Sequence, residues 1–283
     1  MAQLWKGAPV AAALTEQLSQ RAQALIAKGV TPTLAIVRVG ERPEDLSYER
    51  GALKRCEKVG IAVRQYLLTA TSSQTDLMEV MKEINRDDSI HGCLLFRPLP
   101  KHMDEAAVCA ALSPAKDVDG ITAGSLAAVF SGSGAGYPPC TAQACLEILD
   151  HYGYELKGKR AVVVGRSLVI GKPVSMLLLG RHATVTICHT RTADLPAECR
   201  RADLLVAAAG KAGAVSAQCL ASGQVVLDVG INVDEDGNLV GDVDFAAAEN
   251  TVEAITPVPG GVGAVTTSVL ARHVIEAAEK AIG

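Results

Sequence analysis

The amino-acid sequence predicts an α/β protein of two domains, each built on a parallel β-sheet. A chain of 283 residues is long enough for two medium domains with separate cores. Hydrophobic residues make up 49% of the chain but aromatic residues only 3%, which is typical of thin helices packed on buried parallel strands. Short apolar runs also alternate with segments of helical composition, the repeating βαβ pattern of a parallel sheet.

The first half of the chain contains three strand-like runs separated by helical segments. The strands are expected at 33–40, 62–68 and 92–96, and the helices at 43–59, 74–87 and 104–112. The segment from Phe130 to Pro139 is dense in glycine, serine and proline, which indicates a loop or a domain boundary.

A helix from Thr141 leads into a second α/β series. Strands are expected at 160–165, 183–188, 204–208 and 224–230, with a helix at 172–181 and an amphipathic helix at 266–282. We therefore expect residues 1–140, completed by the carboxy-terminal helix 266–283, to form the first domain, and residues 141–265 to form the second.

Charge and hydropathy restrict the class of partner. The net charge of −4 gives no reason to expect nucleic acid or an anionic membrane surface. The amino terminus lacks a signal-type apolar block, and no apolar run approaches 18 residues. We expect a soluble, cytoplasmic protein that acts on a small molecule.

The eight cysteines never form a Cys-x-x-Cys motif, and the six histidines show no His-x-x-x-His spacing. Several cysteines lie inside apolar runs, so buried, reduced thiols are expected, with disulfides or a metal site as the alternative. No metal is predicted.

The stretch from Val162 to Pro173 passes from a buried strand through a glycine turn into a helix. Backbone N–H groups at such a helix start are suited to a pyrophosphate. The turn departs from G-x-G-x-x-G, since Ser167 replaces the middle glycine and Gly171 comes two residues late. An ordinary strand–turn–helix junction is the alternative for this motif taken alone.

The next strand ends in Cys188-His189-Thr190-Arg191 without the carboxylate that grips the ribose hydroxyls of NAD. A hydroxyl and a cation there, with Arg166 in the turn, favour the 2′-phosphate of NADP; solvated loop arginines are the alternative. The loops 209–211 and 229–232 follow later strands, at the edge where open α/β sheets bind ligands.

Several strings together resemble the bifunctional methylenetetrahydrofolate dehydrogenase/cyclohydrolase family. They are VGRSLVIGKP, DVGIN, GDVDF, SPAKDVDG, Pro139-Cys140-Thr141 and, most specifically, ITPVPGGVG at 255–263. They run in the family's order from about residue 30 to 270. The resemblance implies a substrate domain and a Rossmann-like dinucleotide domain with the active cleft between them, a homodimer, and a role in one-carbon metabolism and purine biosynthesis.

The resemblance also implies site residues and a reaction, in which hydride passes from 5,10-methylenetetrahydrofolate to NADP. Tyr48 and Asp119 are the implied catalytic residues. The folate would contact Tyr48, Ala52, Leu95, Phe96, Arg97, Asp119, Pro259, Gly260, Gly261, Val262 and Gly263. NADP would contact Gly165, Arg166, Ser167, Thr190, Arg191 and Ile231.

The chemistry of these residues agrees with several implied roles. Tyr48 offers a flat face and a hydroxyl to a pterin ring, and the Asp119 carboxylate accepts paired N–H donors. Consecutive glycines at 260–261 let the backbone approach a ligand closely. The alternatives are a turn or cap role for Asp119 and a tight turn before the last helix for the glycines.

Two departures from the family pattern bear on the cyclohydrolase step. The family has Tyr-x-x-x-Lys, whereas this chain has Tyr48-x-x-x-Ala52; the family has Gln-Leu-Pro-Leu-Pro, whereas this chain has Phe96-Arg97-Pro-Leu-Pro. Lys54 points to another face of the helix unless the helix bulges at Gly51. The guanidinium of Arg97 would oppose a cationic substrate unless a carboxylate such as Glu49 screens it.

Three functions remain open from the sequence. The first is an NADP-dependent methylenetetrahydrofolate dehydrogenase with weak or absent cyclohydrolase activity. The second is a folate- or nucleotide-binding regulatory protein without turnover. The third is an oxidoreductase for a different pterin or a small acid, because Phe96 and Arg97 change the expected substrate wall.

Overall fold

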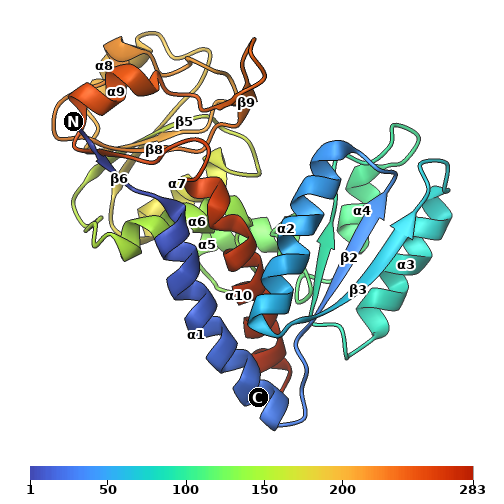
Figure 1. The fold of residues 1–283 in the computed structure, drawn as a ribbon. Helices are drawn as coiled ribbons and strands as arrows, with labels where there is room; N and C mark the ends of the chain where they lie inside the picture. Colours follow the sequence, from blue (N-terminus) through green and yellow to red (C-terminus); the bar gives the residue numbers. More distant parts are fainter. Residues whose placement is uncertain (283) are drawn as a thin grey trace. The chain divides into compact units, whose positions relative to one another are not determined.

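The computed structural model describes residues 1–282, which divide into two compact units. The three-stranded unit contains residues 13–140 and the last helix from Thr267 on; the six-stranded unit contains residues 1–12 and 141–266. Each unit has a parallel sheet flanked by helices (Figure 1), which confirms the predicted fold class. Within the described residues, no helix has the length and apolarity needed to cross a membrane.

In the three-stranded unit, β2 (Thr33–Val39) lies between β3 (Ala62–Leu68) and β4 (Gly92–Leu95), and all three strands are parallel. The helix α2 (Pro43–Val59) connects β2 to β3, and α3 (Gln74–Arg86) connects β3 to β4. The chain passes from β2 to β3 on one side and then crosses back over β2 to β4 on the other side, so the strand order switches between β2 and β4. Ligands of open α/β sheets bind beyond the carboxyl ends of strands at such a point.

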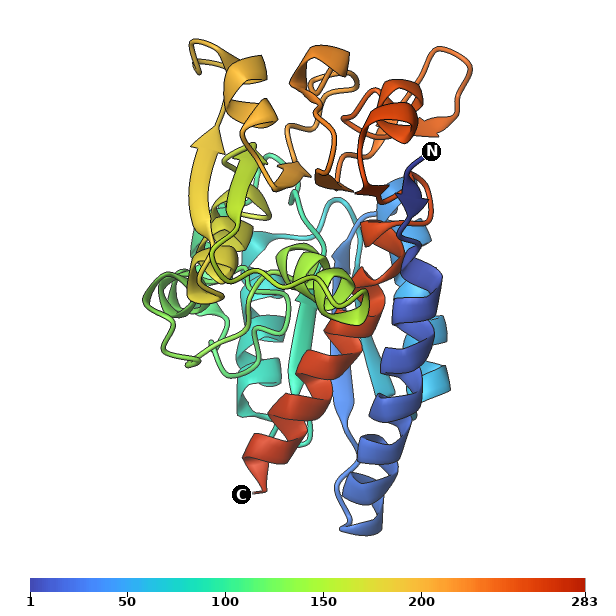
Figure 2. The same ribbon diagram turned by 90° about the vertical axis from the view of Figure 1, so that its left-hand side faces the viewer.

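Helices cover both faces of this sheet. Ala35 and Val37 of β2 pack with Leu77, Met81 and Ile84 of α3 and with α4 (Glu105–Ala111). Strand residues alternate between faces, so the fully buried Leu34 and Ile36 point to the opposite side. Here α1 (Gly7–Ala27) and α10 (Thr266–Ala281) run side by side (Figure 2), joined by the Arg21–Glu279 ion pair at 2.6 Å. The unit also contains α5 (Ala123–Ser131).

The six-stranded unit has a Rossmann-like parallel sheet in the order β1-β11-β8-β7-β5-β6. Its strands are β1 (Gln3–Leu4), β11 (Ala254–Ile255), β8 (Val225–Asp228), β7 (Leu204–Ala207), β5 (Arg160–Val164) and β6 (Thr184–Cys188). Its helices are α6 (Cys140–His151), α7 (Gly171–Gly180), α8 (Leu195–Arg200) and α9 (Phe245–Thr251), with short 3₁₀ turns η1 (Ala217–Cys219) and η2 (Val262–Ala264). An antiparallel pair, β9 (Asn232–Val233) and β10 (Leu239–Val240), stands apart from the sheet. The strand order switches between β5 and β7.

The amino terminus is grouped differently from the expected division at residue 140. Strand β1 pairs with β11, Gln3 opposite Ala254, so residues 1–12 belong to the six-stranded unit and not to the first domain. A two-residue strand has no periodicity that a sequence reading could detect. All eight cysteines are free and buried.

Candidate functional site

Tyr48 and Phe96 meet beyond the carboxyl end of β4. Tyr48 lies on α2 and is partly buried, whereas Phe96 directly follows β4 and is buried. Their ring centroids are 6.0 Å apart and the ring planes meet at 80°, an edge-to-face pair. The Phe96 N–H also donates to the Val37 carbonyl oxygen at 3.0 Å, which fixes this corner at the switch point of the sheet. The structure thus brings two of the predicted folate-binding residues into contact.

Ala52 is buried one turn after Tyr48, with a relative exposure of 1%. Helix α2 is continuous from Pro43 to Val59, so it does not bulge at Gly51. Lys54 is exposed, and no lysine occupies the Tyr48 face of this helix. The alternative in which Lys54 moves beneath Tyr48 is therefore excluded by the helix geometry.

A buried ion pair that the sequence analysis missed lies beside this helix. Arg38 of β2 donates from Nε to Glu49 Oε2 at 2.8 Å, and both side chains are at least nine-tenths buried. Gln65 Nε2 donates to the other oxygen of Glu49 at 2.5 Å. The available signal was an arginine inside the apolar run TLAIVRVG, because a buried arginine requires a partner.

Arg97 has a different partner from the one considered in the sequence analysis. Its Nη1 atom lies 3.5 Å from Glu105 Oε1, and Glu105 Oε2 accepts the Leu99 N–H at 2.9 Å. Glu49 is engaged by Arg38 and Gln65, so the carboxylate beside Arg97 is that of Glu105 and not that of Glu49. Leu95, the last residue of β4, is buried behind this corner.

Asp119 is not the residue that closes its turn. That role belongs to the buried Asp117, whose carboxylate accepts the N–H groups of Ile121 at 2.9 Å and Thr122 at 2.7 Å. Asp119 is partly buried and accepts hydrogen bonds from Cys140. Burial, followed by the neighbouring Asp117 charge, raises the pKa of Asp119 to about 6, against the lowering effects of Cys140 and Arg97. Asp119 is thus left available for a ligand.

Behind Asp119 lies a buried histidine that the sequence analysis did not single out. His273 Nδ1 donates to the Val118 carbonyl oxygen at 2.8 Å and lies 3.9 Å from Cys140 Sγ. Burial lowers the pKa of His273 to about 4, so the ring is neutral near pH 7. It supports the chain segment that carries Asp119.

The predicted dinucleotide turn follows β5 at the switch point of the six-stranded sheet. Gly165 has φ of +133°, and a Cβ atom there would lie 2.0 Å from the Ala208 carbonyl oxygen. A Cβ atom on Gly171 would lie 2.3 Å from the Gly165 carbonyl oxygen. Both glycines therefore permit a tight turn against β7, which agrees with the loop geometry expected from the sequence.

The outer side of this turn presents polar groups. Arg166 and Ser167 are exposed, and the N–H groups of Ser167 and Leu168 find no acceptor within residues 1–282. Such N–H groups, in the turn that leads into helix α7, fit the charge of a pyrophosphate.

The loop after β6 offers no carboxylate that is available to bind a ribose. Thr190 and Arg191 are exposed. The nearest acid along the chain, Asp194, caps α8 by accepting the Ala197 N–H at 3.0 Å. The loop therefore offers a hydroxyl and a cation, as the sequence indicated.

Two buried aspartates organise the remaining loops at this edge. Asp242 accepts the N–H groups of Ala209 at 2.6 Å, Gly210 at 2.9 Å and Lys211 at 2.8 Å, and the Asn232 amide at 3.0 Å. Asp228 accepts the Asp242 N–H at 2.9 Å, and burial raises the pKa of Asp228 to about 6. The 209–211 loop is thus held by the protein's own carboxylate. Ile231, next to Asn232 in the chain, is 65% exposed.

The predicted loop Pro259–Gly263 belongs to the six-stranded unit, whereas Tyr48, Ala52, Leu95–Arg97 and Asp119 belong to the three-stranded unit. Gly260 has φ of +99°, and the Gly260 carbonyl oxygen accepts the Gly7 N–H at 2.8 Å. A Cβ atom on Gly261 would lie 2.5 Å from the Pro257 carbonyl oxygen. Val262 is buried, while Pro259 and Gly263 are exposed. Both glycines therefore meet the needs of a tight turn.

Within residues 1–282, no group of three or more His, Cys, Asp or Glu side chains is placed to hold a metal ion. The chemistry available is that of hydrogen-bond acceptors, backbone N–H donors and cations at the carboxyl edges of two sheets.

Comparison with known protein families gives two adjacent matches. Residues 5–119 match the catalytic domain of tetrahydrofolate dehydrogenase/cyclohydrolase, and residues 139–282 match its NAD(P)-binding domain. A protein of Clostridioides difficile named bifunctional protein FolD is 50% identical over 275 residues, which cover 97% of this chain and 96% of that protein. A protein of the same name from Carboxydothermus hydrogenoformans is 50% identical over 281 residues, covering 99% and 98%.

Solved structures agree with these matches. The bifunctional FolD methylenetetrahydrofolate dehydrogenase/cyclohydrolase of Campylobacter jejuni superposes with a TM-score of 0.96 at 36% identity, covering 99% of both chains. The FolD enzyme of Trypanosoma brucei, solved with NADP cofactor and an inhibitor, has a TM-score of 0.93 at 33% identity, covering 99% of this chain and 98% of that one. The chain therefore belongs to the tetrahydrofolate dehydrogenase/cyclohydrolase family.

Proposed function

We propose that this chain catalyses the NADP-dependent oxidation of 5,10-methylenetetrahydrofolate to 5,10-methenyltetrahydrofolate. The observation that carries this function is that Asp117 relieves Asp119 of turn closure, while the Asp119 carboxylate lies close enough to Arg97, just after β4, for their charges to interact. An acceptor carboxylate in that position suits the paired N–H donors of a pterin. Family membership supports the same reaction.

The three-stranded unit supplies the folate-binding residues in this proposal. Asp119 accepts pterin N–H groups, and Tyr48 offers a ring face whose orientation is held by Phe96. Ala52, Leu95 and Arg97 complete that wall. The loop Pro259–Gly263 of the six-stranded unit stays a predicted folate-binding segment that offers backbone groups and little side-chain bulk.

The six-stranded unit supplies the cofactor-binding residues. Gly165, Arg166 and Ser167 hold the pyrophosphate region through backbone N–H groups and charge, while Ile231 contributes apolar contact. Thr190 and Arg191 take the place of the ribose-binding carboxylate, which favours a 2′-phosphate and hence NADP over NAD. The bound dinucleotide supplies the hydride acceptor.

Hydride transfer depends mainly on positioning, so the chain's residues need only hold and orient the two reactants and exclude water. Hydride transfer can therefore proceed with alanine at position 52, where the family has lysine. The cyclohydrolase step requires a proton-exchanging lysine, and Ala52, Phe96 and the exposed Lys54 provide none on the Tyr48 face of α2. We therefore propose that cyclohydrolase activity is weak or absent.

The test is to follow the two activities separately in the purified protein. Cofactor reduction by methylenetetrahydrofolate is expected with NADP, together with decay of methenyltetrahydrofolate no faster than the uncatalysed rate. A protein that binds NADP and folate without reducing the cofactor would be the non-catalytic regulator. Reduction only with another pterin or a small acid would favour the third function.

The expected homodimer and cytoplasmic location remain predictions. Light scattering on the purified chain measures its oligomeric state, and fractionation of the source cells measures its location.

A further inference from the structure

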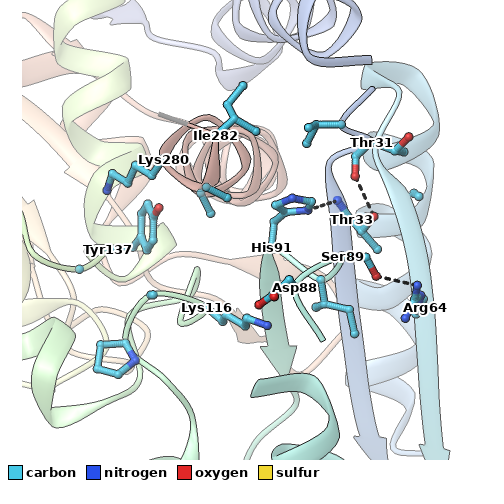
Figure 3. Close-up of a pocket in the computed structure, with 18 of the residues that line it drawn as sticks. Thr31, Thr33, Arg64, Asp88, Ser89, His91, Lys116, Tyr137, Lys280 and Ile282 are labelled. Carbon is cyan, nitrogen blue, oxygen red and sulfur yellow. Dashed lines mark hydrogen bonds between the residues drawn. The ribbon is translucent and has the colours of Figure 1, made fainter. Parts of the chain in front are cut away.

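A large cavity lies in the three-stranded unit, at the end of the sheet away from the proposed folate-binding residues. Its volume is about 1350 Å³, and Thr33, Ala62 and His91 place it at the amino ends of β2, β3 and β4. Phe96 and Arg97 follow the carboxyl end of β4. A seven-residue strand such as β2 spans about 23 Å, so the two regions are separate sites. Figure 3 shows the cavity with Tyr137 and His91 on facing walls.

The first notable group is His91, which is 7% exposed. Its Nδ1 atom accepts the Thr33 N–H at 3.2 Å (Figure 3). Burial, followed by the Lys116 charge, lowers the pKa of His91, so the ring is neutral near pH 7 and carries its proton on Nε2. Nε2 makes no hydrogen bond within residues 1–282. His91 therefore presents an unused N–H donor.

The second group is Tyr137, which is 3% exposed and whose hydroxyl has no hydrogen-bond partner in the described part of the chain. Burial and the charges of Glu276 and Glu279 raise the pKa of Tyr137 to about 12, so the hydroxyl remains a donor. A buried unpaired hydroxyl destabilises a protein relative to phenylalanine. Tyr137 lines the cavity, so a small turn of its side chain toward a bound ligand would complete the missing hydrogen bond.

The charges that line the cavity favour an anion, and the two acids near Tyr137 that lie outside the lining, Glu276 and Glu279, are paired with Arg272 and Arg21. Three of the four acidic or basic residues that line it are cationic, namely Arg64, Lys116 and Lys280, against Asp88. Arg64 is engaged by Asp87, and Lys116 donates to the carbonyl oxygens of Ile84 and Asp87, both at 2.7 Å. Lys280 is exposed and lies 4.5 Å from the Tyr137 ring centroid, which places an available ammonium group next to the unused hydroxyl.

The rest of the lining is largely apolar, including Val30, Val63, Ile90, Pro114, Ala277 and Ile282. Apolar walls with a few convergent polar groups are typical of small-molecule sites. We propose that this cavity binds a small organic oxyanion, a carboxylate or phosphate monoester joined to an apolar body. In this complex His91 Nε2 and the Tyr137 hydroxyl donate to the oxyanion, and Lys280 is its counter-ion.

Calorimetric titration with benzoate and with phenyl phosphate tests the proposal without any turnover, so its result is independent of the proposed enzymatic function. Both probes are expected to bind saturably, and the neutral analogue benzyl alcohol more weakly. Tyr137→Phe should weaken oxyanion binding about tenfold, the effect of one hydrogen bond to a charged group, while Tm stays equal or rises. Lys280→Ala should also weaken oxyanion binding. Lys82→Ala is the control and should leave binding unchanged, because Lys82 is an exposed lysine on α3 that pairs with Glu79.

Three results would overturn the proposal. One is the absence of saturable binding of both probes up to about 10 mM. Another is probe binding that neither Tyr137→Phe nor Lys280→Ala changes, because the probe would then bind elsewhere. Competition by tetrahydrofolate would place that binding at the folate site. The third is a lower Tm in Tyr137→Phe with unchanged probe affinity, which would make the hydroxyl a structural group.

Discussion

Arg38 Nε donates to Glu49 Oε2 at 2.8 Å, and this ion pair is buried between β2 and α2, one turn before Ala52. Removing one member of a buried pair leaves the other charge without compensation. We predict that Glu49→Ala lowers the free energy of unfolding by about 3–5 kcal/mol, the range for breaking such a pair. Denaturant titration measures it.

The double variant Arg38→Leu with Glu49→Val is the matched control, because apolar residues of similar volume replace both charges. Its stability should lie within about 1 kcal/mol of the native protein or above it. If the double variant is as unstable as Glu49→Ala, the loss comes from packing and not from an uncompensated charge.

Asp119 and Asp117 offer a comparison between neighbouring carboxylates. Asp119→Ala should weaken tetrahydrofolate binding roughly 10- to 100-fold, as expected for lost hydrogen bonds to a charged acceptor, while Tm near pH 7 stays equal or rises because a desolvated charge is removed. Asp117→Ala should lower Tm, because it leaves the N–H groups of Ile121 and Thr122 unpaired. Titration and thermal melting of both variants measure this difference. The reverse pattern would return Asp119 to a turn role.

The raised pKa of Asp119 predicts opposite pH trends for stability and binding. The pKa is about 6 in the folded chain against 3.8 normally, so the folded state holds the proton more tightly. The favourable contribution to stability is present at low pH and is lost as pH rises from about 4 through 6. Folate binding needs the charged carboxylate, so affinity should rise over the same window. Asp119→Asn should flatten both profiles; unchanged profiles would contradict the assignment.

The sequence predicted the sheet strands longer than two residues well, because runs such as 33–40 and 204–208 are apolar, short and bounded by turn residues. It missed β1 and β11, whose pairing is decided by tertiary contact and not by periodicity. In the candidate site, the position of Ala52 followed directly from helical spacing. The partners of Arg97 and Glu49 could not be predicted in this way, because a long charged side chain can pair with any of several neighbours that only the folded chain brings close.

Arg166 and Arg191 are predicted to set the cofactor preference. Both are exposed, and the nearby Asp194 is occupied in capping α8. Arg166→Glu and Arg191→Glu should each lower kcat/KM for NADP far more than for NAD, because a carboxylate repels the 2′-phosphate. Arg201→Glu, at an exposed site just after α8, is the control and should leave the ratio unchanged. An unaltered ratio of kcat/KM for NADP and NAD in both Arg166→Glu and Arg191→Glu would show that other residues select the cofactor.

The last prediction concerns the cyclohydrolase step. Ala52→Lys combined with Phe96→Gln should create hydrolysis of methenyltetrahydrofolate that the native protein lacks. Ala52 is 1% exposed on the Tyr48 side of α2, so a lysine there would be desolvated and its pKa lowered toward neutrality. Phe96 packs edge-to-face on Tyr48, and an amide in its place would give the new ammonium an acceptor. Decay of methenyltetrahydrofolate absorbance above the uncatalysed rate is the measurement.

Three comparisons separate a proton-exchanging lysine from a change of shape. Ala52→Met with Phe96→Gln has similar bulk without the amine and should stay inactive. Ala52→Lys alone should gain less, because the ammonium would face the Phe96 ring without an acceptor. Lys54→Ala should change nothing, since Lys54 is exposed on a continuous helix. Robust hydrolysis by the native protein would mean that a group other than an α2 lysine exchanges the proton; Asp119, with its pKa of about 6, would then be the first residue to replace.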